Sequence, residues 1–134
     1  MGQPCRSEPN PRRSGAICAW WDADDSRLGR NARVAIQRAA DVYVSVVSAW
    51  EIAIKTALGK LRTKRRPAEA VADADFRELA LTFEHTEALG GLPPHHADPF
   101  DRLILAVAQV EGLTIVTSDR RFSLYDVPLL DAHR

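Results

Sequence analysis

The chain has 134 residues, of which 46% are hydrophobic, and this length and composition suit one folded domain with a sizeable core. Its 18 Lys and Arg residues balance its 18 Asp and Glu residues, so any contact with nucleic acid requires a local basic patch. Two cysteines without metal-site spacing, no apolar run of membrane-spanning length and no signal-peptide pattern predict a cytoplasmic protein that has no membrane association.

The first fifteen residues, MGQPCRSEPNPRRSG, combine Pro, Arg, Ser and Gly without apolar periodicity. Such a segment buries too little apolar surface to offset the entropy lost on ordering. We therefore expect residues 1–15 to form a disordered arm and residues 16–134 to form the domain. The apolar segment AICAWW at 16–21 is expected to open a short helix, and the pattern over 29–40 predicts a second one.

The clearest early strand is VYVSVV at 42–47, because its β-branched and aromatic residues suit a strand covered on both faces. It runs into SAWEIAIKTALGKL, an amphipathic pattern that predicts a helix beginning at Ser48 and ending at Gly59. A basic loop, KLRTKRR, follows. A helix near 69–74, a strand over 78–82 and a short helix ending at Gly90 and Gly91 are expected next.

The second half of the chain contains the strongest helix signal, PFDRLILAVAQVE at 99–111, which lies between Asp98 and Gly112. A buried strand is expected over 114–117, and a last short strand over 127–130. Strands that alternate with helices predict an α/β chain with a three-layer α/β/α arrangement and a mainly parallel sheet.

Three carboxylates, Glu51, Asp101 and Asp119, stand where a strand gives way to a helix or loop. In open α/β sheets the carboxyl ends of the strands form the binding crevice, so these side chains can converge. Each also has a structural interpretation. Glu51 has capping-box spacing from Ser48, Asp101 lies in a first helical turn after the N-cap Asp98, and Asp119 suits an Asx-turn.

Four segments between residues 20 and 130 resemble, in order and spacing, the VapC-type branch of the PIN domain family. They are WWDADDSRLG, VYVSVVSAWEIAIKTALGKL, LPPHHADPFDRLILAVAQVEGLTIVTSDRRF and YDVPLL. The resemblance implies a PIN-like fold and a metal-dependent ribonuclease. By similarity, Glu51 falls on the family's acid in its SxxWE segment, Asp101 on the acid of DPFDR and Asp119 on the acid of TxD. Mg²⁺ or Mn²⁺ is the implied cofactor, because these ions prefer carboxylate oxygens.

The N-terminus departs from the family pattern, in which an apolar strand runs into an Asp that binds the metal. Counted back from Trp20 and Trp21, that position is Ser14, which cannot supply a charged ligand. The preceding PCRSEPNPRR has no strand character, so the first strand is expected to be missing or irregular. Its loss would leave neighbouring strand edges unpaired.

The resemblance implies an endoribonuclease toxin of a VapBC-type toxin–antitoxin system that hydrolyses RNA phosphodiester bonds. A cognate VapB-like antitoxin would hold it inactive, and a homodimer is expected. The alternative is a catalytically inactive PIN module that keeps only its antitoxin-binding or dimerisation surfaces, and metal titration separates the two.

The basic loop is the best candidate for a patch that binds RNA phosphates, since such binding depends on clustered positive charge. Its candidate residues are Lys64, Arg65 and Arg66, and Arg102 beside Asp101 is a fourth. Solvated loop charge and an ordinary surface arginine are the structural alternatives.

Overall fold

The computed structural model describes residues 15–18, 29–39, 41–62, 66–95, 98–117, 120–131 and 133–134. The expected arm lies outside these residues except for Gly15, so the domain boundary stays a prediction. Within the described ranges, no helix is both long enough and apolar enough to cross a membrane.

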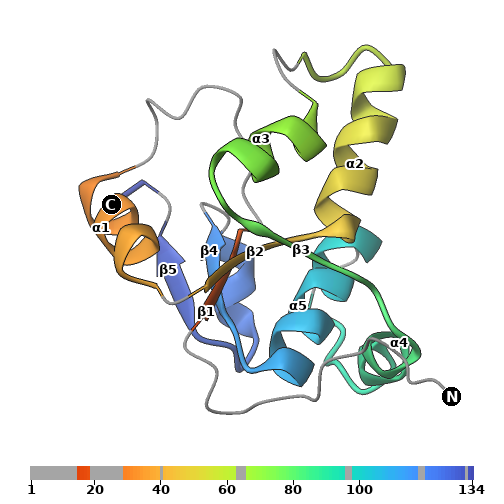
Figure 1. Ribbon diagram of the computed structural model, residues 1–134. Helices are drawn as coiled ribbons and strands as arrows, with labels where there is room; N and C mark the ends of the chain where they lie inside the picture. The colour runs from red at the N-terminus through yellow and green to blue at the C-terminus, as the bar shows by residue number, and fades with distance from the viewer. Residues whose placement is uncertain are drawn as a thin grey trace, which may run out of the picture.

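The described residues form a five-stranded sheet in the order β3-β2-β1-β4-β5, and every neighbouring pair of strands is parallel. The strands are β1 Gly15–Cys18, β2 Asp41–Ser45, β3 Arg77–Leu79, β4 Thr114–Thr117 and β5 Leu129–Asp131. The helices are α1 Arg30–Arg38, α2 Val46–Ala57, α3 Pro67–Asp73, α4 Phe83–Leu89, α5 Pro99–Glu111 and the 3₁₀ helix η2 Arg120–Leu124. In Figure 1, α1 lies to the left of the sheet, and α2, α4 and α5 lie to its right. The predicted α/β class with a parallel sheet is confirmed.

The prediction of a missing first strand is wrong, because residues 15–18 form the central strand β1. Ile17 is in register with Tyr43 of β2 on one side and Ile115 of β4 on the other. Without this strand, β2 and β4 would each present an unpaired row of backbone groups, so pairing overrides the weak local pattern. The helix expected from residue 16 is wrong for the same reason.

The position of β1 also changes how the N-terminus compares with the family pattern. The strand begins at Gly15 and ends at Cys18. The residue at its carboxyl end is therefore Cys18, whereas Ser14, the position matched by counting, precedes the strand and lies outside the described residues. Among the described residues, the central strand therefore follows position 14 and does not run into it.

Helix α2 begins earlier than predicted, because Ser45 and not Ser48 is its N-cap. The Ser45 hydroxyl accepts a hydrogen bond from the Val47 amide at 3.1 Å. Ser48 lies inside the first turn, where its hydroxyl is buried and has no hydrogen-bond partner among the described residues. The predicted capping box is wrong, since the chain leaves the sheet at Ser45, and Glu51 is therefore left without a capping role.

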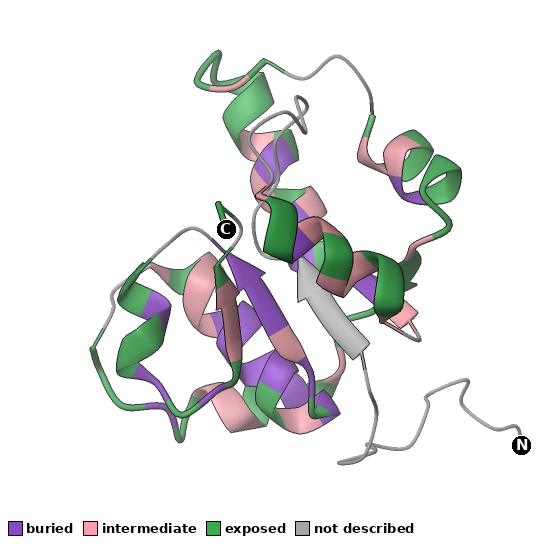
Figure 2. Ribbon diagram, turned by 90° about the vertical axis from the view of Figure 1, so that its left-hand side faces the viewer, coloured by how far each residue is buried: buried purple, intermediate pink, exposed green. Residues whose placement is uncertain are grey.

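Helix α5 forms the centre of the core, together with β2 and β4. Residues 103–108 are buried without interruption, and so are most residues of the two strands (Figure 2). A helix that is apolar on all sides is enclosed by other elements, here by α2, α4 and β4. Gly112 ends it in the left-handed conformation at φ 69°, as the sequence predicts. Burial of residues 103–108 holds the whole helix, including its amino end, in place against the sheet.

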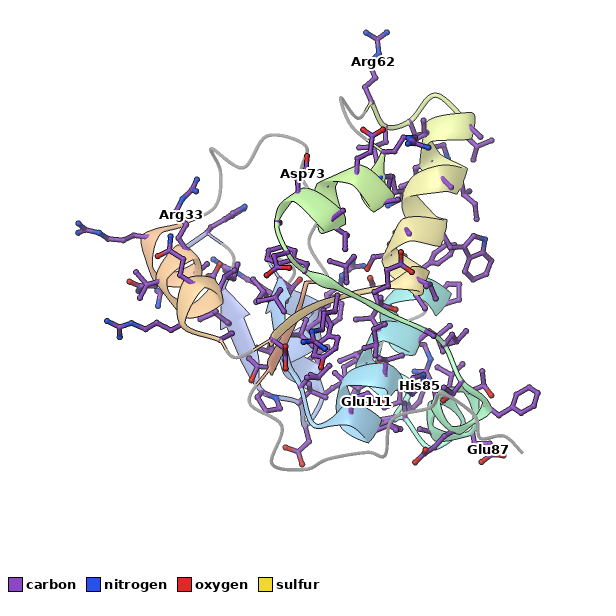
Figure 3. All side chains as sticks on the ribbon, viewed as in Figure 1. Arg33, Arg62, Asp73, His85, Glu87 and Glu111 are labelled. Atoms are coloured by element: carbon purple, nitrogen blue, oxygen red, sulfur yellow. The ribbon has the colours of Figure 1, made fainter. Side chains whose placement is uncertain are left out.

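A buried polar pair joins the carboxyl end of α5 to α4. His85 Nε2 lies 2.8 Å from Glu111 Oε2, and the two side chains face each other in Figure 3. The Thr82 amide donates to His85 Nδ1 at 3.0 Å. Because Nδ1 accepts that bond, the imidazole proton is on Nε2 and is donated to the Glu111 carboxylate. This network closes α4 against the far end of α5.

Candidate acidic site at the carboxyl ends of the strands

The order in which the chain adds strands to the sheet reverses between β1 and β4. The chain adds β2 and β3 on one side of β1, and β4 and β5 on the other. In open parallel sheets, the crevice beyond the carboxyl ends of the strands at such a point is where ligands bind. Helix α2 starts directly from the carboxyl end of β2, and residues 118–119 follow the carboxyl end of β4.

Glu51 lies on α2, six residues beyond the end of β2. Its side chain is 18% exposed, and its Oε2 atom lies 2.8 Å from Lys55 Nζ. The four-residue spacing places both side chains on one helix face, with the carboxylate on the amino side, which is the favourable order for an ion pair. The Lys55 side chain is 50% exposed, so its ammonium reaches solvent.

The amino end of α5 supplies two further carboxylates with different roles. Asp98 is the N-cap, and its Oδ1 accepts hydrogen bonds from the amides of Phe100 at 2.9 Å and Asp101 at 3.2 Å. This confirms the predicted capping role. Asp101 lies in the first turn, and its side chain is 15% exposed. Its Oδ2 lies 3.9 Å from a guanidinium nitrogen of Arg121, so a cation stands beside it.

The acids of α2 and α5 act on the same group. The pKa of Lys55 is raised above its ordinary value, chiefly because its ammonium hydrogen-bonds to Glu51, and the charges of Asp98 and Asp101 raise it further. The helix ends are also in direct contact, since the Trp50 and Phe100 rings meet edge to face with centroids 4.8 Å apart. The helix ends that carry Glu51 and Asp101 are therefore in contact. Asp119, the third predicted acid, lies outside the described residues.

The described residues do not make up a metal-ion site by themselves. Among them, no three His, Cys, Asp or Glu side chains converge as ligands. Glu51 and Asp101 present carboxylate oxygens only, a donor set that suits Mg²⁺ or Mn²⁺ better than zinc. Mg²⁺ is commonly held by one or two carboxylates together with water and substrate phosphate, so the residues present fit such an ion.

The predicted RNA-binding residues fall in separate places. Arg102 donates to the backbone oxygens of Pro93 at 2.8 Å and Leu92 at 3.3 Å, so it fastens the loop before α5. Arg66 forms a two-nitrogen ion pair with Glu69 at 2.7 and 2.9 Å. Lys64 and Arg65 lie outside the described residues. RNA binding by these four side chains stays a prediction.

Two cations of the site, Lys55 and Arg121, were not among the predicted site residues. A signal for Lys55 exists in the sequence, since it follows the candidate ligand Glu51 by four positions in a helical pattern. The contact between Arg121 and Asp101 joins η2 to α5 and depends on the tertiary fold.

Comparison with known proteins gives consistent matches. The model of the family "PIN domain" matches residues 14–128. The chain is 32% identical over 120 residues to "Ribonuclease VapC22" of Mycobacterium tuberculosis, a match that covers 84% of this chain and 88% of that protein. Its fold is similar to a chain of VapBC2 from Rickettsia felis, solved in complex with a promoter DNA fragment. That match has a TM-score of 0.61 and 14% identity, and it covers 87% of this chain and 97% of the other.

Proposed function

The chain belongs to the PIN domain family and, within it, to the VapC type, and we propose that it is a metal-dependent endoribonuclease of a toxin–antitoxin system. In this proposal Glu51, Asp101 and Asp119 hold Mg²⁺ or Mn²⁺, and the protein hydrolyses RNA phosphodiester bonds. The naming of a VapC relative as a ribonuclease supports the reaction class.

The main structural support is that α2, which carries Glu51, contacts the first turn of α5, which carries Asp101. Both acids raise the pKa of the same lysine, and both side chains are largely withdrawn from solvent. Carboxylates held close together repel one another, and a bound dication relieves that repulsion. Helices fixed in the core thus keep an arrangement that a cation would stabilise.

A metal ion bound there would activate a water molecule for attack on the phosphorus and neutralise charge on the phosphate oxygens. Glu51 and Asp101 would hold it from α2 and α5. Asp98 keeps the amides of Phe100 and Asp101 satisfied, and so fixes the helix end from which Asp101 projects. The site would act on a phosphate that enters the crevice beyond the carboxyl ends of the strands.

The test is cleavage of a mixed-sequence RNA pool by the purified chain with MnCl₂, followed on denaturing gels. Asp101→Asn removes one ligand charge at constant shape, and we expect it to lower the rate by more than about 100-fold, since even outer-shell partners of metal sites contribute 10- to 100-fold. The matched control is Asp75→Asn. Asp75 is exposed and has a left-handed φ of 58°, which asparagine also adopts readily. Equal cleavage by all three proteins would reject the proposal.

The second candidate function is an inactive PIN module. It is favoured by the N-terminal sequence, in which counting places Ser14 at the family's metal-binding Asp, and by Cys18, which is not an acid, at the carboxyl end of β1. Such a protein would fold and bind its partner, but it would neither bind Mn²⁺ nor cleave RNA at any concentration tested.

We further propose a VapB-like antitoxin as partner, a homodimer as the assembly and the cytoplasm as the location. Several large apolar side chains are solvent-exposed, and such side chains mark protein-binding surfaces when they gather. The most exposed are Trp50, Leu58, Phe83 and Leu124. Copurification with a coexpressed antitoxin, and a mass measurement in solution, would test these assignments.

A further inference from the structure

Lys55 is a cation within an acidic site, and this position needs an explanation. A pair of Glu and Lys four residues apart on a surface helix is common and contributes little. The pair between Lys55 and Glu51 differs in two respects. The Glu51 side chain is mostly withdrawn from solvent, at 18% exposed. The charges that act on Lys55 also include Asp98 and Asp101, which belong to another helix.

Without a metal ion, Lys55 offsets part of the negative charge of the site. Glu51, Asp98 and Asp101 contribute negative charge, and Lys55 lies 2.8 Å from one oxygen of Glu51. The ammonium therefore occupies part of the space and charge that a dication bound to Glu51 would require. A dication on the Glu51 carboxylate would repel the ammonium at close range and weaken its ion pair, which favours release of Lys55.

The RNA substrate carries the same sign of charge as the acidic side chains of the site. An RNA phosphate is anionic and must approach a cluster of carboxylates, which repel it unless positive charge is present. The Lys55 ammonium is attached to a flexible stem of four carbons and is 50% exposed, so it can leave Glu51 without crossing the core. A lysine behaves as a point charge toward phosphate and needs no fixed geometry to bind it.

Building on the proposed metal-dependent ribonuclease, we propose that Lys55 is a phosphate-binding residue of this site. It neutralises Glu51 while the metal ion is absent, and it turns to a non-bridging oxygen of the RNA phosphate once a metal ion takes its place. The Lys55 ammonium thus alternates between the Glu51 carboxylate and the RNA phosphate. The same substitution should consequently have opposite effects on metal binding and on RNA binding.

The experiment compares wild type, Lys55→Gln and Lys55→Arg. Mn²⁺ binding is measured by calorimetry without RNA. RNA binding is measured by fluorescence anisotropy with a labelled, mixed-sequence 2′-O-methyl RNA in saturating Mn²⁺. We expect Lys55→Gln to bind Mn²⁺ about two- to fivefold more tightly, the range of an exposed ion pair. It should bind RNA more weakly, and its logarithmic salt slope should fall by about 0.7, the value for one contact to a single strand. Lys55→Arg should retain RNA affinity.

The matched control is Arg77→Gln. Arg77 is an exposed cation whose Nε lies 3.0 Å from Asp41 Oδ1. Both residues begin strands, so the pair lies at the amino ends of β2 and β3, and the candidate site lies beyond the carboxyl ends. This variant should leave both affinities unchanged.

Three results would overturn the assignment of Lys55. If Lys55→Gln behaves like Arg77→Gln, the lysine takes no part in the site, although the ribonuclease proposal survives as long as wild type binds Mn²⁺ and cleaves RNA. Tighter Mn²⁺ binding with unchanged RNA binding would make Lys55 a counter-ion only. Absence of Mn²⁺ binding by folded wild type would reject both the metal-dependent function and this inference.

Discussion

The two ends of α5 place acidic side chains in opposite environments. At the carboxyl end, Glu111 is buried, accepts a hydrogen bond from His85 and closes α4 onto the core. At the amino end, Asp98 and Asp101 lie where α5 meets α2, and their charges reach the half-exposed Lys55. Glu111 is matched by one buried donor, whereas the cations beside Glu51 and Asp101 reach solvent. The carboxyl end of α5 is therefore suited to stabilising the fold, and the amino end to binding a charged ligand.

Removing one partner of the buried pair should have the largest effect on stability. His85→Leu leaves the Glu111 carboxylate without its imidazole donor and the Thr82 amide without its acceptor. We expect the free energy of unfolding to fall by about 3 kcal/mol in urea titrations, because a buried carboxylate loses its hydrogen-bond donor. The double variant His85→Leu, Glu111→Leu should recover part of the loss, because it removes the buried charge but not the unpaired Thr82 amide. A single variant as stable as wild type would contradict this role.

Arg102 adjoins Asp101 at the amino end of α5, yet its contacts are structural. Its guanidinium spans the carbonyl oxygens of Leu92 and Pro93, a forked geometry that lysine cannot reproduce. Arg102→Lys should cost about 2 kcal/mol, and hydrogen exchange at the Leu92 amide, which bonds to Leu89, should accelerate. Unchanged exchange with weaker RNA binding would instead assign Arg102 to the substrate.

Replacing either of two serines at the start of α2 by alanine should affect stability differently. Ser45 caps the helix, so Ser45→Ala should lower stability by about 1 kcal/mol. The Ser48 hydroxyl is buried without a hydrogen-bond partner among the described residues, so Ser48→Ala should leave stability unchanged or raise it by up to about 1 kcal/mol. Midpoints of thermal unfolding would distinguish the two. A loss in both variants would show that Ser48 has a partner.

The smallest expected effect is a dependence of stability on alkaline pH. The folded-state pKa of Lys55 is raised above its ordinary 10.5, so protonated Lys55 stabilises the fold below that value, and the contribution disappears as the pH rises through the folded pKa. Because the side chain is half-exposed, solvent screening keeps the effect below about 1 kcal/mol. Lys55→Gln should reduce this alkaline loss relative to wild type. An identical loss in both proteins would place its origin elsewhere.

Elements with local end signals were predictable from sequence. Helix α5 and strand β4 have their predicted bounds, because Asp98 with Pro99 and then Gly112 mark the ends of the helix. Strand β1 was not predictable, since GAIC has no local periodicity and is defined by pairing with β2 and β4, which lie far along the chain. The choice of Ser45 over Ser48 as N-cap likewise depends on where β2 leaves the sheet.

The site was predictable in part, for the same reason. Glu51 and Asp101 occur in segments with a recognisable pattern, and the fold brings α2 and the first turn of α5, which carry them, into contact. The ion pair of Lys55 is local, but its involvement with Asp98 and Asp101 requires the packing of α2 against α5. Metal ligation by Glu51, Asp101 and Asp119 remains a prediction that binding measurements must test.

A comparison of two variants tests whether the amino end of α5 binds the metal ion and the carboxyl end stabilises the fold. Mn²⁺ affinity by calorimetry and stability in urea would be measured together for Asp101→Asn and Glu111→Leu. We expect Asp101→Asn to lose Mn²⁺ binding and to change stability by no more than about 1 kcal/mol, the usual contribution of a first-turn acid. Glu111→Leu should lose about 2 to 3 kcal/mol of stability and keep Mn²⁺ affinity. Mn²⁺ binding that survives in Asp101→Asn, or that disappears in folded Glu111→Leu, would contradict the account.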